Sequence, residues 1–326
     1  MTMRTANPVL LAALLAALAG CGNSDASKST SPAAASRTAA SPVSATAEEV
    51  AEEARGNVRC PAKVKSPARA AQAPVDDILG VRPGMTYEEA ANVVMCTHDL
   101  MVVSADSTRG LQLQTYGQTV RQGFEARFAK PRVEKTSKQI MQELQDNAMA
   151  RGSNRVTRDL QPGEAKWFVG AMGVPEHERV ISAAREEWFE EGRNPTVASV
   201  EQALVAKYGT PTRNQPAGDR KHLTWAYDPL GRLVTETSPL FHRCIGTADP
   251  NGGANFSPDC GIVVAAVIAG MRDNAALAQF MQVGVVDQAG GYEAVSATEL
   301  SLQQSDARRR AEQVDAATKN AGVPKL

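Results

Sequence analysis

Aromatic residues and net charge are what this sequence has least of. Aromatic residues make up 5% of the 326 residues, so we expect a core built mainly from Val, Leu, Ala and Met. The formal net charge is −1 at pH 7, with 35 basic and 36 acidic residues. Domains that bind nucleic acid usually carry a marked basic excess. The composition therefore argues against a nucleic-acid partner and against a polybasic membrane patch.

The sequence also lacks the short motifs that mark common catalytic, metal and cofactor sites. Its four histidines, His98, His177, His222 and His242, do not have metal-ligand spacing, and no Cys-x-x-Cys pair accompanies them. The glycines around residues 80–84 fit neither a P-loop nor a dinucleotide fingerprint. No Gly-x-Ser-x-Gly elbow or Ser-x-x-Lys motif is present. We therefore predict no metal, no cofactor and no catalytic residue.

The apolar run near the N-terminus, Val9–Ala19, is 11 residues long and too short to cross a bilayer as a helix. Arg4 precedes it, which is typical of a signal peptide over residues 1–20. The run ends in Leu18-Ala19-Gly20-Cys21, which resembles the lipobox of bacterial lipoproteins. The resemblance implies cleavage before Cys21 and acylation of its thiol and new amine. An ordinary cleaved signal peptide is the alternative.

The residue after the lipobox cysteine bears on location. Lipoproteins retained in the inner membrane typically carry Asp at this position, whereas this chain has Gly22. The resemblance therefore favours the outer membrane over the inner membrane, with the folded part facing the periplasm. Several acyl chains on one cysteine would hold the protein on the membrane, since a single chain binds only marginally.

Four further cysteines are present: Cys60, Cys96, Cys244 and Cys260. An even number of cysteines in an exported chain indicates two disulfides, for which three connectivities exist. We favour Cys60–Cys96 and Cys244–Cys260, because each of these pairings keeps both partners within one segment.

Composition and periodicity divide the rest of the chain into three parts. Residues 21–74 are predicted to be a disordered tether that begins with a part rich in Ser, Ala, Thr and Pro. Within it we expect one or two helical turns over Glu48–Ala54 and an extended segment over Pro61–Pro74. We expect an N-terminal module over 75–164 and a C-terminal module over 165–326 that ends in a helix. Four helices are predicted. The first begins at Thr86, where Glu89 completes a capping box. The second covers 138–150, the third ends at Tyr208, and the fourth covers 305–320.

The predicted strands cover 110–116, 124–128, 166–172, 179–189, 223–227, 233–237, 261–268 and 280–286. The strand over 233–237 is expected to form a hairpin with that over 223–227. Hairpin turns rather than βαβ crossovers connect them, so we predict an α+β fold with an antiparallel sheet and packed helices. Two small similar modules would fit this pattern. The start of the helix that ends at Tyr208 is ambiguous between Thr196 and Ser199. Aligning Thr86 with Ser199 gives two identities in 11 positions, close to chance, so a true repeat stays undecided.

Short motifs in both halves resemble the SmpA/BamE family of outer-membrane lipoproteins. In the first half, Gly84-Met85-Thr86 opens a capped helix. In the second half, a helix ends in Lys207-Tyr-Gly-Thr-Pro211, and Trp225-Ala-Tyr227 follows on a strand. The resemblance covers about 30 residues in each half of a much longer chain. It implies helices packed on a small antiparallel sheet and a non-catalytic accessory role in outer-membrane assembly.

Two places on the chain are candidate binding surfaces. Trp225 and Tyr227 share one face of a predicted strand, where they form part of the core or a platform for stacking a ligand. The loop between Cys244 and Cys260 carries Asp249, Asn251 and Asp259, whose spacing is not that of an EF-hand, and turn chemistry explains these residues.

We therefore expect a non-catalytic, membrane-anchored envelope lipoprotein that binds or scaffolds other envelope components. The alternatives are a periplasmic hydrolase with a site of dispersed Asp, Glu and His residues, and a module that binds a small ligand or peptide.

Overall fold

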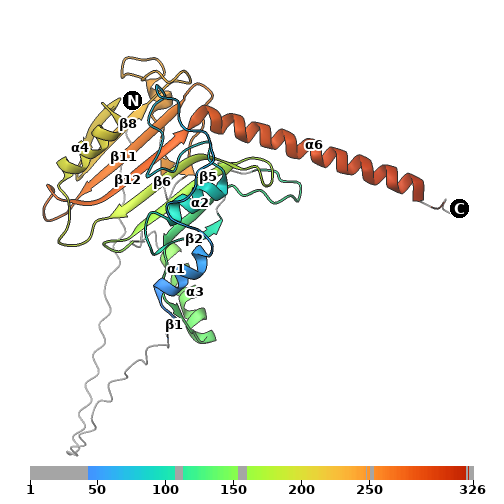
Figure 1. The fold of residues 1–326 in the computed structure, drawn as a ribbon, viewed down its shortest axis with the longest axis horizontal. Coiled ribbons are helices and arrows are strands. Elements are labelled where there is room, and N and C mark those ends of the chain that lie inside the picture. The colour runs from blue at the N-terminus through green and yellow to red at the C-terminus, as the bar shows by residue number, and fades with distance from the viewer. Residues whose placement is uncertain are drawn as a thin grey trace, which may run out of the picture. The chain divides into compact units, whose positions relative to one another are not determined.

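An eight-stranded antiparallel sheet forms the centre of the fold (Figure 1). The structure, a computed structural model, describes residues 43–106, 113–152, 160–246, 248–249, 253–320 and 322. Its helices are α1 (Ala47–Arg55), α2 (Tyr87–Met95), α3 (Ser137–Gly152), α4 (Val197–Tyr208), α5 (Phe241–Cys244) and α6 (Gln288–Asn320). Its strands are β1 (Val43–Ala45), β2 (Met101–Asp106), β3 (Gly123–Phe128), β4 (Arg132–Val133), β5 (Ala165–Met172), β6 (Arg179–Trp188), β7 (Arg213–Ala217), β8 (Arg220–Ala226), β9 (Ala248–Asp249), β10 (Gly253–Ala254), β11 (Ile262–Gly270) and β12 (Ala278–Asp287).

The strand order of the large sheet is β2-β3-β5-β6-β12-β11-β8-β7, and every neighbouring pair is antiparallel. This confirms the predicted α+β class. The predicted boundary at 164/165 falls between β3 and β5, which are hydrogen bonded to each other in this sheet. The strands of both predicted modules therefore share one sheet, and β6 and β12 join its two halves.

The two halves of the sheet are built from the same order of elements. In each half a helix precedes two strands, an insertion and two more strands: α2, β2, β3, an insertion with β4 and α3, β5, β6; then α4, β7, β8, an insertion with α5, β9 and β10, β11, β12. The junction between the halves lies after β6, because β6 completes the first four strands.

The entry to the helix is also the same in both halves. Thr86 caps α2 and forms an isolated bridge with the first residue of β6; Thr196 caps α4 and bridges Leu277, next to β12. Thr196 is the cap because its hydroxyl accepts from the Ser199 amide at 3.0 Å. The alignment of Thr86 with Ser199 is therefore wrong by three residues. The equivalent positions after Thr86 and Thr196 share no identical residue over the length of α2.

The side chains of successive strand residues point to opposite faces of the sheet, and each face packs against different elements. α2 and α4 cover one face through a continuous core that includes Val94, Leu204, Trp167 and Trp225. On the other face Ala184, Ala226, Val263 and Val286 pack against the insertion that contains Cys244 and Cys260.

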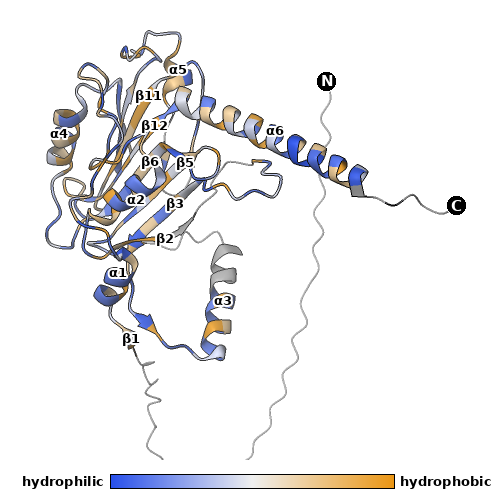
Figure 2. Ribbon diagram, turned by 45° about the vertical axis from the view of Figure 1, so that its right-hand side comes forward, coloured by the Kyte–Doolittle hydropathy of each residue, from blue (hydrophilic) through white to orange (hydrophobic). Residues whose placement is uncertain are grey.

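Helix α6 lies partly against this second face and then leaves it. Leu302 is buried, whereas every residue from Ala307 to Lys319 is exposed. Figure 1 shows the helix extending away from the sheet, and Figure 2 shows strongly hydrophilic turns along this outer part. None of the helices within the described ranges combines the length and the apolar character needed to cross a membrane.

Both favoured disulfides are present, which confirms the pairing. Cys60 and Cys96 have their Cα atoms 5.5 Å apart, and Cys244 and Cys260 have theirs 5.3 Å apart. The first disulfide ties the segment before α2 to the residue that follows its last turn. The second closes the insertion that covers the sheet.

The part of the predicted tether that the structure describes, residues 43–74, contains one helix, α1. α1 begins with a capping box between Thr46 and Glu49, and its Ala51 is buried against Val102 and Ala129. The sequence pattern missed this contact because α1 is short and its partners lie more than 50 residues away.

Two strand predictions also differ from the structure. Part of the strand predicted over 110–116 lies outside the described residues, and 113–116 is not a strand. The predicted return over 233–237 is reduced to one bridge between Tyr227 and Leu233. The strand that forms a hairpin with β8 is instead β7. The pattern missed β7 because Pro216 argues against a strand. β7 lies at the edge of the sheet, where proline is tolerated.

The capping box of α2 also anchors the preceding segment. The Glu89 carboxylate accepts hydrogen bonds from the backbone amide of Ser66 at 2.9 Å and from that of Thr86 at 3.0 Å. Burial acts to raise the pKa of Glu89, but the hydrogen bonds from Ser66, Thr86 and Lys65 outweigh it and lower that pKa to about 2.

Glu89→Gln should therefore lower the free energy of unfolding in a pH-dependent way. The folded-state pKa lies below the unfolded value of about 4.3, so the stabilisation is present above that value and is lost as the pH falls towards 2. Urea unfolding should show the largest difference between wild type and variant above about pH 5 and a shrinking difference below pH 4. The exposed Glu52→Gln serves as the control. A difference that does not change with pH contradicts this account.

Candidate functional site

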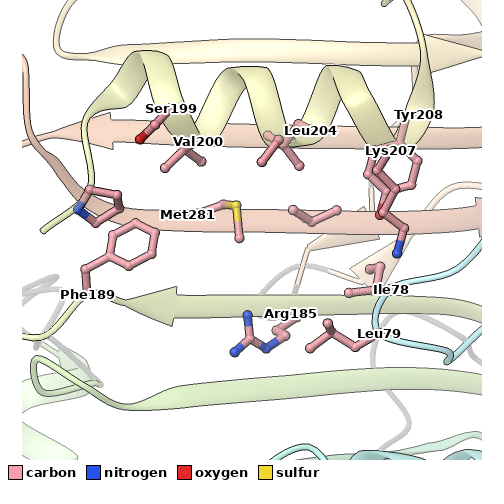
Figure 3. Close-up of a pocket in the computed structure, with 13 residues that line it drawn as sticks. Ile78, Leu79, Arg185, Phe189, Ser199, Val200, Leu204, Lys207, Tyr208 and Met281 are labelled. Atoms are coloured by element: carbon pink, nitrogen blue, oxygen red, sulfur yellow. The ribbon is translucent and has the colours of Figure 1, made fainter.

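A groove lies on the helix-covered face, between α4 and the two central strands β6 and β12 (Figure 3). Its volume is about 400 Å³, within the range of small-molecule sites. It lies over the junction of the two halves, because α2 packs on the strands of the first half and α4 contacts those of the second.

The long walls of the groove are apolar. Val200 and Leu204, one turn apart on α4, project towards β12, where Met281 lies opposite them (Figure 3). Val283 of β12 also lines the groove. Ala203 lines the groove and is exposed. The spacing of Val200 and Leu204 explains this geometry, since residues i and i+4 lie on the same side of a helix.

Phe189 and Pro195 lie at one end of the groove, and the turn that precedes α2 closes the other. Two contacts to Asp77 fix this turn to the last residues of α4. The Tyr208 hydroxyl donates to the Asp77 carbonyl at 2.9 Å, and the Lys207 ammonium lies 2.9 Å from the Asp77 carboxylate. Burial, together with the nearby Asp77 charge, raises the pKa of Tyr208, so this phenol stays neutral and acts as a donor.

Leu79 is held at the rim of the groove in an unfavourable backbone conformation. Its φ is 46°, in the left-handed region that non-glycine residues rarely adopt, and 53% of the residue is exposed. Reciprocal hydrogen bonds between Ile78 and Val81, each 2.9 Å long, enforce this turn. Strain of this kind persists where the surrounding structure imposes it and is common at ligand sites.

A second apolar hollow lies on the other side of Leu79. Pro61, Val64 and Val93 line it together with the turn at Leu79 and Gly80. The Cys60–Cys96 disulfide holds the Pro61–Val64 segment beside α2. Because Leu79 borders both hollows, apolar surface continues from the groove along the outside of this turn.

Arg185 brings a positive charge to the groove from β6 (Figure 3). Its Nη1 lies 2.5 Å from the Glu187 carboxylate, and its guanidinium carbon lies 5.9 Å from the centre of the Trp167 ring. The Nε atom of Arg185 and the Nε1 atom of Trp167 are buried and have no hydrogen-bond partner within the described part of the chain. Buried donors without a partner are energetically unfavourable.

The residues predicted as binding surfaces lie elsewhere. Trp225 is fully buried, with its ring 5.3 Å from that of Tyr208 and its Nε1 donating to the Gly209 carbonyl at 2.8 Å. It is therefore a core residue, the first of the two alternatives predicted for it. Tyr227 is half-buried, and burial raises its pKa.

In the disulfide loop, Asp249 lies in the short strand β9, Asp259 forms an ion pair with Arg243, and Asn251 lies outside the described residues. Cys21 also lies outside them. Across the ranges that the structure describes, no group of three His, Cys, Asp or Glu residues is placed to hold a metal ion.

The groove was not predicted, although the sequence contains two signals of it. One is the apolar pair Val200 and Leu204, four residues apart on a predicted helix; the other is Arg185, a charged residue that directly follows Ala183-Ala184 on a predicted strand. Neither signal identifies a site until the pairing of Arg185 with Val283 brings β6 and β12 together.

No protein family, curated protein or solved structure matches this chain. The site is therefore interpreted from its own geometry.

Proposed function

We propose that this protein is a non-catalytic lipoprotein of the bacterial envelope, anchored through Cys21 to the periplasmic side of the outer membrane. Its groove between α4 and β12 binds an apolar part of another envelope component. The observation that supports this proposal is the groove. It is a preformed hollow of about 400 Å³ with mainly apolar walls, and β6 contributes the guanidinium of Arg185 to it.

The polar groups at the groove support a binding role. They are the guanidinium of Arg185, the ammonium of Lys207 and the hydroxyls of Ser199 and Tyr208. Lys207 and Tyr208 are both engaged with Asp77. Apolar walls with a few polar groups that orient a ligand are typical of binding pockets.

The location rests on the resemblance of Leu18-Ala19-Gly20-Cys21 to a lipobox and on the identity of Gly22. The two disulfides support it, because structural disulfides form in oxidising compartments such as the periplasm. The resemblance of the helix motifs to SmpA/BamE lipoproteins supports a non-catalytic role in the same compartment.

Cys21→Ala should release the protein from the membrane, because acylation requires this thiol. Fractionation of cells into soluble and membrane material should move the variant to the soluble periplasmic fraction. Sucrose-gradient separation of wild-type membranes should place the native protein with the outer membrane. A variant that stays as membrane-bound as wild type would overturn the anchor.

Ala203→Trp should fill the groove from an exposed position and exclude its occupant. The protein is purified from envelopes in mild detergent, and copurifying molecules are identified by native mass spectrometry. We expect bound material with wild type and at least a fivefold loss with Ala203→Trp. Ala206→Trp, at an exposed position of α4 that does not line the groove, should retain it. Equal retention by both variants contradicts a role for the groove.

A further inference from the structure

We propose that the groove binds a long-chain monocarboxylate: its acyl chain lies along α4 and its carboxylate pairs with Arg185. This inference rests on the proposed function and names the class of ligand.

The form of the apolar surface favours a flexible, unbranched chain. The groove runs along α4 from Phe189 to the turn at Leu79, and apolar surface continues past Leu79 to Val64. An elongated apolar surface of this kind matches an acyl chain better than a compact ring system. Each methylene buried there should strengthen binding by up to about fourfold.

Arg185 selects the head group. A guanidinium has five N–H donors, and Glu187 engages Nη1 at 2.5 Å. Nε is buried and has no hydrogen-bond partner among the described residues. Nε and Nη2 form one edge of the guanidinium, and two parallel hydrogen bonds from such an edge match a carboxylate. The site therefore retains the edge that a second carboxylate would occupy.

The charges around the groove favour a ligand with a single negative charge. Lys207 is paired with Asp77, whereas Arg185 has both a partner and unused donors. The Glu187 side chain is 34% exposed against 15% for Arg185, so water screens the carboxylate more than the guanidinium. One further carboxylate can be accommodated by Arg185. Among the residues that line the groove the other cation, Lys207, is already paired with Asp77, so a dianionic head group lacks a second partner.

A peptide C-terminus also has a carboxylate, but its backbone fits the groove less well. Each peptide unit adds a donor and an acceptor that must be paired when buried. The groove lining offers few side-chain groups for this, because the Tyr208 hydroxyl is committed to the Asp77 carbonyl. An acyl chain has no donors or acceptors that must be paired along its length, so the groove fits a lipid better than a peptide.

The test compares head groups on one chain length with the intact folded protein. Isothermal titration with dodecanoate and dodecyltrimethylammonium below their micelle concentrations, and with dodecanol below its solubility limit, should give at least about tenfold tighter binding for the acid than for either of the others. This comparison needs no variant. Equal affinity for acid and alcohol overturns the carboxylate assignment.

Variants then assign the preference to one residue. Arg185→Gln should reduce the preference for dodecanoate over dodecanol to within about threefold, and Arg185→Lys should restore it only in part, since Lys lacks the two-donor edge. Arg193→Gln, on a side chain that is 79% exposed, is the matched control and should retain the wild-type preference. Retention by Arg185→Gln overturns the role of Arg185. If Arg185→Gln fails to fold, the wild-type comparison still decides.

The remaining outcomes separate this inference from the proposed function. Tight binding of dodecanol that Ala203→Trp abolishes keeps the groove as a site and rejects the monocarboxylate. Tighter binding of an apolar peptide with a free C-terminus than of dodecanoate also rejects it. Affinity that does not increase from octanoate to dodecanoate rejects a buried chain.

Discussion

The antiparallel pairing of β6 with β12 is the interaction on which the rest of this structure depends. It runs from the pair Phe280–Trp188 to the pair Val286–Ser182 and joins two halves that each consist of a helix and four strands. Each half alone would expose a long, unpaired strand at its edge, which is a hazard for aggregation. The pairing removes both edges and places Arg185 beside Val283, and thereby forms the base of the groove.

The groove follows from how two similar halves meet. α2 and α4 are held at equivalent points, since the Met85 carbonyl accepts from Val180 and the Pro195 carbonyl accepts from Ala278, both at 2.8 Å. Each helix therefore covers its own strands, and the surface above β6 and β12 is left to the turn around Leu79. A strained, exposed leucine, a half-buried arginine whose Nε has no hydrogen-bond partner among the described residues, and apolar walls are together costly for folding. A ligand that pairs with them would offset that cost.

Local features could be predicted from the sequence, whereas features that need distant contacts could not. The capping box of Thr86, the hairpin of β5 and β6 and both disulfides depend on nearby residues or on simple segment pairing. The packing of α1 against Val102 and Ala129 depends on partners far along the chain. The site belongs to this second class, because Arg185 and Met281 are almost 100 residues apart and no local pattern links them.

The central claim is that an acyl chain lies in the groove, and the methyl group of Met281 reports on it directly. Met281 lines the groove, whereas Met85 and Met172 are buried elsewhere in the fold. In methionine methyl-labelled protein titrated with dodecanoate, nuclear Overhauser contacts should connect the ligand chain to the Met281 methyl and not to those of Met85 and Met172. Binding without any contact to Met281, or with equal contact to all three, would contradict the account.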